Sequence, residues 1–249
     1  MTIRGFLQSP AMAILVLALI WLAVVPVLGI SPRILPPLQT VLADGWKIAP
    51  GLASSFLRTL TETLLGFAAG AAFGFLCGTG FSYVRFLERS LFPIFVASQT
   101  VPVIAFGAVV VISFGNTILA KVVIAFYLTF FPVTVNTLRG LRSADPQKID
   151  LLQSFGASRF QIFWKYALPS ALPTIFVGLK LGIALSLIGA MVGDWFGETV
   201  GLGVLLLQAM YMEQVPRIWL LIIVCGALGG MLYGALVLIE RRFIWWRGD

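Results

Sequence analysis

The sequence predicts an all-α, polytopic membrane protein with about six transmembrane helices in a single domain, residues 1–249. Hydrophobic residues make up 59% of the chain, charged residues only 11%, and the mean hydropathy is +1.00. A soluble core cannot account for so much apolar surface, so a large part of that surface must face lipid. Roughly six spans of ~20 residues with short connections use the whole length, which leaves no room for a second domain.

Six apolar segments are long enough to cross a bilayer. They cover approximately residues 10–29, 60–80, 91–113, 118–137, 174–193 and 217–239. The first could be a signal peptide, because Arg4 precedes it. However, its apolar core from Ala11 to Leu28 is longer than a usual signal-peptide core, and no clear A-x-A cleavage site follows. We therefore expect a membrane helix there.

Two of the connections contain structure of their own. The first, Ser31 to Pro50, includes SPRILPP and predicts a proline-stiffened loop with a short helix from Thr40 to Ile48. The last, roughly Asp194 to Pro216, contains a moderately apolar stretch that could form a re-entrant or interfacial helix. Between them, the second span is dense in small residues, which predicts close helix packing. These residues are Gly66, Ala68, Ala69, Gly70, Ala71, Ala72, Gly74, Gly78 and Gly80.

Two charged residues fall inside predicted spans. Glu62 lies in the second span, and an acid inside the membrane is a functional candidate, here for the substrate path. Its place near the outer end of the span equally suits a hydrated boundary residue. Lys180 lies in the fifth span, where we expect it to snorkel toward the cytoplasm; the alternative is an ion pair with a carboxylate.

The third span is the best candidate for lining a substrate path. It begins with Pro93 and continues as SQTVPVIAFG. Pro102 removes an internal hydrogen-bond donor and frees a backbone carbonyl near Gln99 and Thr100. Broken helices at membrane depth are tolerated chiefly where they line a protein cavity. The alternative is a proline kink that contacts no ligand.

The longest polar passage, about 139–173, predicts two short helices joined by a hinge. Asp145 followed by Pro146 is a helix start, and Gly156 supplies the backbone that ends the helix. Ser158 and Gln161 have the spacing of a capping box at the start of a second helix. Both helices carry stripes at helical spacing, and we expect Pro169 to stop the second. The stripes are Lys148, Leu151, Leu152 and Phe155, then Phe160, Phe163, Trp164 and Ala167.

The composition makes several chemistries improbable. The chain has no histidine, and its two cysteines, Cys77 and Cys225, lie inside apolar runs, so we expect no metal site, no disulfide framework and no catalytic residues. No G-x-x-x-x-G-K-[ST] phosphate-binding loop occurs. If ATP and Mg²⁺ drive this protein, a partner chain must bind them, and we expect this chain to bind no cofactor itself.

The distribution of Lys and Arg predicts that both termini are cytoplasmic. With that orientation the outer side receives mainly Arg33, Lys47, Arg58 and Arg217, with Lys121 near a short outer turn. The cytoplasmic side carries Arg4, Arg85, Arg89, Arg139, Arg142, Lys148, Arg159, Lys165, Arg241, Arg242 and Arg247. Topology and anionic membrane lipid therefore explain the net charge of +7, and no nucleic-acid partner is needed.

The polar passage resembles the "EAA" loop of bacterial ABC importer permeases. That pattern is Glu-Ala-Ala, three residues, Gly, nine residues, a hydrophobe, two residues and Pro. Asp150, Gly156, Tyr166 and Pro169 occupy the Glu, Gly, hydrophobe and Pro positions, whereas Leu151 and Leu152 replace the Ala pair. The resemblance implies a coupling helix that sits in a groove of a cytoplasmic ATPase. It assigns that coupling to Asp150, Leu151, Leu152, Gly156, Ala157, Ser158, Arg159 and Pro169. The alternative is an amphipathic loop that lies on lipid.

The resemblance covers nearly the whole chain and includes SQTVPVIAFGAVVV, LPSALPTIFVGLKLGIALSLIGAMVGDWFG and GLGVLLLQA. These runs look like permeases of the nitrate, sulfonate and taurine importer group, and most like those for thiamine-pyrimidine precursors and riboflavin. The resemblance implies the type I ABC importer permease fold in the inner membrane and alternating access. It also implies two permease subunits in a homodimer, two ATPase subunits and an extracytoplasmic binding protein. A permease for nitrate, sulfonate, taurine or a similar anion, and an ion-coupled secondary transporter, remain as alternatives.

Overall fold

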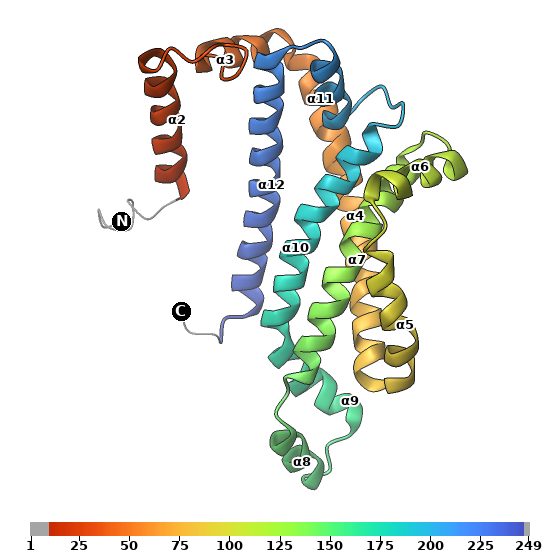
Figure 1. Cartoon of the computed structure of the whole chain (residues 1–249). Coiled ribbons are helices and arrows are strands. Elements are labelled where there is room, and N and C mark those ends of the chain that lie inside the picture. Colours follow the sequence, from red (N-terminus) through yellow and green to blue (C-terminus); the bar gives the residue numbers. More distant parts are fainter. Residues whose placement is uncertain (1–9, 247–249) are drawn as a thin grey trace.

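A computed structural model describes residues 10–246, and the regular structure in that range is helical (Figure 1). Arg4 and Arg247 lie outside the described residues. The helices are α2 (Pro10–Val27), α3 (Leu38–Lys47), α4 (Ala49–Tyr83), α5 (Arg85–Ser98), α6 (Val103–Phe114), α7 (Ile118–Arg142), α8 (Pro146–Ser154), α9 (Arg159–Ile162), the π-helical turn η1 (Phe163–Ala167), α10 (Leu168–Asp194), α11 (Leu202–Tyr211) and α12 (Val215–Phe243).

The expected all-α membrane fold is confirmed, and the described residues account for four or five of the about six expected spans by length and hydropathy. Within residues 10–246, four helices are long and apolar enough to cross a membrane, namely α4, the continuous helix of α9, η1 and α10, α7, and α12. A fifth span exists if α5 and α6 count as one, although they are bent by 97° relative to each other. The helix α2 contributes a shorter apolar stretch, Leu15–Val25.

The helices α4, α7 and α10 form the core of the molecule, and glycine lets them approach closely. Four glycines of α4, spaced four residues apart, face α7: Gly66, Gly70, Gly74 and Gly78. A Cβ at Gly74 would lie 2.5 Å from the Phe130 carbonyl oxygen, and one at Gly78 would lie 2.6 Å from the Thr134 carbonyl oxygen. No side chain can be accommodated at such distances, so the predicted packing role of this face is confirmed.

A second set of glycines packs α10 against α7, next to α4 and on some of the same α7 residues, Ala125, Thr129 and Val133. A Cβ at Gly178 would lie 2.8 Å from the Asn136 Cβ, and one at Gly189 would lie 2.7 Å from the Ala125 Cα. The helices α4, α7 and α10 therefore all pack against one another, and the backbone of α7 lies nearly in contact with those of α4 and α10. Because close-packed elements deform little, these three helices form a stiff body.

The described N-terminal helices α2 and α3 contact α12 at one end of the molecule (Figure 1). The Trp21 indole N–H donates to the Pro36 carbonyl at 2.9 Å, and its ring meets Trp219 edge-on at 4.9 Å between centroids. Arg217 of α12 forms a bidentate pair with Asp44 of α3 at 3.0 and 3.1 Å. The helix predicted from Thr40 to Ile48 is thus confirmed as α3, and it lies on the side opposite α8 and α9.

Candidate functional site

The polar loop after α7 contains two short helices, α8 and α9, which have capped ends and are joined by a short hinge. The Asp145 carboxylate accepts from the Gln147 N–H at 3.0 Å and caps α8. At the other end Gly156 has φ +80°; its N–H donates to the Gln153 carbonyl at 2.8 Å, and the Ala157 N–H donates to the Leu152 carbonyl at 3.0 Å. This pair of bonds is a Schellman motif, which requires the left-handed conformation that glycine adopts easily.

The second helix of the loop starts immediately after the hinge. The Ser158 hydroxyl accepts from the Gln161 N–H at 3.3 Å, and the Gln161 side chain accepts from the Ser158 N–H at 2.8 Å. This reciprocal capping box confirms the prediction from their spacing. Only three residues, 155–157, therefore separate two capped helices, so the loop has a defined shape before any partner binds.

The prediction that Pro169 stops the second helix is wrong. The chain stays helical from Arg159 to Asp194, with Pro169 at the beginning of α10. The residues just before it form the π-helical turn η1, in which the Leu168 N–H donates to the Phe163 carbonyl. A proline ring clashes with the carbonyl four residues earlier in a regular α-helix, and the wider π-turn relieves this restriction.

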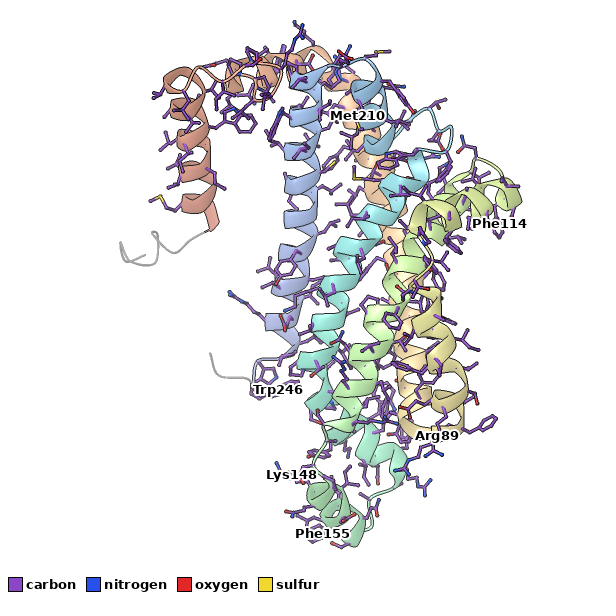
Figure 2. All side chains as sticks on the ribbon, viewed as in Figure 1. Arg89, Phe114, Lys148, Phe155, Met210 and Trp246 are labelled. Atoms are coloured by element: carbon purple, nitrogen blue, oxygen red, sulfur yellow. The ribbon has the colours of Figure 1, made fainter. Side chains whose placement is uncertain are left out.

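The tip of the loop exposes large apolar side chains. Phe155 is 80% exposed, Phe160 is 72% exposed and Leu151 is 55% exposed, and Figure 2 shows Phe155 at the far end of the molecule. Asp150 and Arg159 are also exposed, whereas Leu152 and Ala157 are half-buried. The predicted stripes are therefore not buried faces, because most of their members point into solvent.

Sequence reasoning missed the residues that attach the loop to the core. Ile149 of α8 packs against the buried cluster of Leu141 and Ala167. The Tyr166 hydroxyl accepts from the Asp145 N–H at 3.1 Å and so ties the start of α8 to η1. The loop pattern marked Tyr166 as its hydrophobic position. The pattern could not predict the contact of the Tyr166 hydroxyl, because that contact depends on the fold.

The predicted third span is two helices that meet at an elbow. The segment predicted at 91–113 is therefore broken, with a 97° bend between α5 and α6, and Pro93 lies inside α5 instead of beginning a helix. Gln99 ends α5 and is half-buried, Thr100 is exposed in the break, and Pro102 is the residue from which α6 starts. In a continuous helix residue 102 would donate to the Ser98 carbonyl, and proline cannot.

The Ser98 carbonyl accepts two hydrogen bonds in the elbow instead, one from the Val101 N–H at 3.1 Å and one from the hydroxyl of Tyr127 of α7. The Tyr127 ring stacks on Phe106 of α6 at 4.0 Å between centroids. Beside the elbow, further rings from three helices form an aromatic cluster. They are Phe73, Phe95, Phe126 and Phe130, with Phe95 and Phe130 5.1 Å apart and Phe73 and Phe126 5.4 Å apart.

Glu62 does not lie at the elbow; it belongs to a buried network of charges. Its side chain is completely buried and accepts from the Arg58 Nε at 2.8 Å. The expectation of a hydrated boundary residue is therefore wrong. Lys121 of α7 is also completely buried and pairs with Glu198 at 2.9 Å, and Arg58 reaches the same carboxylate at 3.4 Å. We call Arg58, Glu62, Lys121, Asp194 and Glu198 the outer charge network.

Asp194, at the end of α10, fixes the start of α11. Its carboxylate accepts from the Gly203 N–H at 3.0 Å and from the Thr59 hydroxyl at 3.4 Å. The Thr59 hydroxyl in turn accepts from the Leu202 N–H at 2.9 Å. The Asp194 carboxylate and the Thr59 hydroxyl thus satisfy two amide groups at the N-terminus of α11, where negative charge is favourable. A Cβ at Gly201 would overlap the Asp194 carboxylate, which explains the glycine there.

Glu198 lies in the loop between α10 and α11, where two cations keep it ionised. Burial opposes this ionisation, but the hydrogen bond from Lys121 and the charges of Lys121 and Arg58 outweigh it and hold the pKa of the carboxyl below its ordinary value. Lys180 also has a partner. The alternative of an ion pair is confirmed, because its ammonium lies 2.8 Å from Glu240 in the last turn of α12.

Comparison with known proteins identifies a family. Residues 70–245 match the model described as "Binding-protein-dependent transport system inner membrane component". The chain is 35% identical to the formylaminopyrimidine transport permease protein ThiX of Halalkalibacterium halodurans, over 96% of each. It is 31% identical to the riboflavin transport system permease protein RibX of Chloroflexus aurantiacus (95% and 89% covered), and 30% identical to the taurine transport system permease protein TauC of Escherichia coli (94% and 88%). In fold it is similar to a chain of the MetNI methionine ABC transporter in an inward-facing conformation, with a TM-score of 0.62, 19% identity, and 81% of this chain and 98% of that chain covered.

Proposed function

We propose a coupling mechanism and a solute class on the premise that the chain belongs to the family of binding-protein-dependent transport system inner membrane components and is a permease subunit of an ABC importer. Membership of this family replaces the alternative of an ion-coupled secondary transporter. ATP hydrolysis, with its Mg²⁺, belongs on a separate ATPase subunit, and this chain supplies the membrane path.

The loop of α8, Gly156 and α9 docks into the ATPase. The observation that carries this assignment is the exposure of Phe155 and Phe160 on a loop whose shape is fixed by caps on both sides of the hinge. Burying one such ring in a groove contributes about 1.5–3 kcal/mol. Because the loop is already ordered, little conformational entropy is lost on docking.

The working importer contains two copies of this chain, two ATPase subunits and an extracytoplasmic binding protein. With the loop on the ATPase side, both termini lie in the cytoplasm; this proposal is supported by the start of α2 and the end of α12, which point the same way as the loop in Figure 1. This orientation agrees with the surplus of Lys and Arg on that side.

The transported solute is a small, flat organic molecule, similar to a thiamine-pyrimidine precursor or to riboflavin. Two relatives at 35% and 31% identity are named for formylaminopyrimidine and riboflavin. The aromatic cluster beside the elbow suits a flat ring, and Gln99 and Thr100 offer neutral polar contacts. A taurine-like anion is the second candidate, since a relative at 30% identity is named for taurine transport.

Removal of the exposed rings tests the docking assignment. We expect the variant Phe155→Ala/Phe160→Ala to insert normally but to lose co-purification of the ATPase and solute uptake in reconstituted vesicles. Phe114→Ala is the matched control, because Phe114 is 50% exposed and lies far from the loop in Figure 2. A stoichiometric complex that transports normally with both rings removed would refute the assignment.

A further inference from the structure

The outer charge network contains three carboxyl groups and two cations. Each packed element contributes to it: Arg58 and Glu62 from α4, Lys121 from α7, Asp194 from α10 and Glu198 from the following loop. Two further groups border it. Asn116 accepts a hydrogen bond from Lys121, and Cys225 of α12 lies close enough to be influenced by the charge of Asp194. With every group ionised, the network carries one uncompensated negative charge.

Two carboxylate oxygens in this network accept no hydrogen bond from the described residues. They are Glu62 Oε2 and Asp194 Oδ1, and both side chains are at least 99% buried. The second oxygen of each group is well bonded, to Arg58 in one case and to Gly203 and Thr59 in the other. An ionised oxygen buried without a partner is costly, and buried acids usually become neutral instead.

The two bare oxygens belong to residues that are linked through Thr59. Glu62 follows Thr59 by one turn of α4, and the Thr59 hydroxyl contacts the Asp194 carboxylate. Glu198, by contrast, has two cationic partners at 2.9 and 3.4 Å. Arg58 is shared between Glu198 and Glu62, which it meets at 2.8 Å, and Asp194 forms no ion pair with the described residues. Glu62 and Asp194 therefore have one shared cation between them, and the surplus negative charge resides on these two carboxyl groups.

We infer that Glu62 and Asp194 hold one proton between them at neutral pH, so that the outer charge network is electrically neutral. The proton converts one carboxylate into a carboxylic acid, whose O–H is a donor for a nearby oxygen that otherwise has none. It belongs to the pair and not to one residue, because the groups interact. Residues 10–246 contain no group of three or more His, Cys, Asp or Glu side chains arranged to hold a metal ion.

Infrared spectroscopy of the permease with its ATPase in lipid nanodiscs tests this inference. A protonated buried carboxyl gives a C=O stretching band that is separate from the carboxylate bands and shifts in D₂O. We expect this band in the wild type at neutral pH and its loss in Glu62→Gln and in Asp194→Asn, because each amide makes the network neutral without a proton. Raising the pH should remove the band from the wild type.

Glu88→Gln is the matched control. Glu88 pairs with Arg142 at 2.7 Å on the surface of the molecule, so the band should persist in this variant. If Asp194→Asn fails to fold because Asp194 caps α11, Glu62→Gln alone decides the result, since Glu62 accepts a hydrogen bond only from Arg58 among the described residues. A wild type without the band at neutral pH, or a band that survives in Glu62→Gln, would overturn the proton assignment.

Discussion

Gly156→Val should weaken binding of the ATPase without preventing membrane insertion. Gly156 has φ +80°, and a Cβ placed there meets nothing within 4 Å, so the substitution has no steric cost from neighbours. The cost is conformational only: a side chain in the left-handed region costs roughly 1–2 kcal/mol, and a β-branched one at least that much. Such a penalty corresponds to a factor of about 5–30 in an equilibrium. If the loop relaxes to avoid it, the docking affinity falls by that factor.

Titration of the ATPase onto the permease in nanodiscs measures this affinity, and uptake into vesicles reports the consequence. Gly156→Asn is the control, because asparagine tolerates the left-handed conformation and should retain affinity within a few-fold of the wild type. Equal affinities for the wild type and the valine variant would refute the reasoning. So would an asparagine variant as weak as the valine variant, because size and not φ would then matter.

Three further outcomes are expected. A cysteine at Ser158 should react with an impermeant thiol reagent only from the cytoplasmic side and one at Thr199 only from the outside; labelling in the reverse sense would contradict the proposed orientation. Gln99→Leu should reduce uptake while the ATPase stays bound, and unchanged uptake would remove the elbow from the substrate path. Lys180→Met should lower the thermal stability of the complex, because it leaves Glu240 unpaired. Breaking a buried pair costs about 3–5 kcal/mol, and the partial exposure of both groups reduces this cost. The double variant Lys180→Met/Glu240→Met should recover most of the lost stability, and no recovery would show that the pair is not the cause.

Local sequence signals predicted the helix caps and the hinge of the polar loop correctly. An N-cap, a Schellman glycine and a capping box each depend on residues within five positions of one another, so Asp145, Gly156 and Ser158 could be read from spacing alone. The glycine face of α4 was predicted for the same reason, since four-residue spacing places those residues on one side of a helix. Its partner, α7, could not be predicted from the spacing.

The outer charge network could not be predicted, because its members are distant in sequence. Glu62, Lys121 and Asp194 come from three helices and meet only through the glycine-mediated packing of the core. The prediction that Pro169 ends a helix was wrong for a related reason. Proline normally ends a helix, and the π-turn that lets this helix continue has no signature in sequence. The elbow was foreseen at Pro102, but one of the donors that stabilise it, Tyr127, lies in another helix.

The continuous helix of α9, η1 and α10 connects the loop around Gly156 with the outer charge network. Its 36 residues span ~54 Å at 1.5 Å per residue. It begins next to the hinge at Gly156 and ends at Asp194, which caps α11 at the opposite end (Figure 1). Gly178 and Gly189 hold α10 close against α7, so this part of the helix cannot bend away from the core when the loop tilts. In the proposed coupling, movement of the docked loop must therefore displace the outer charge network together with the core, or be taken up at the hinge or at η1.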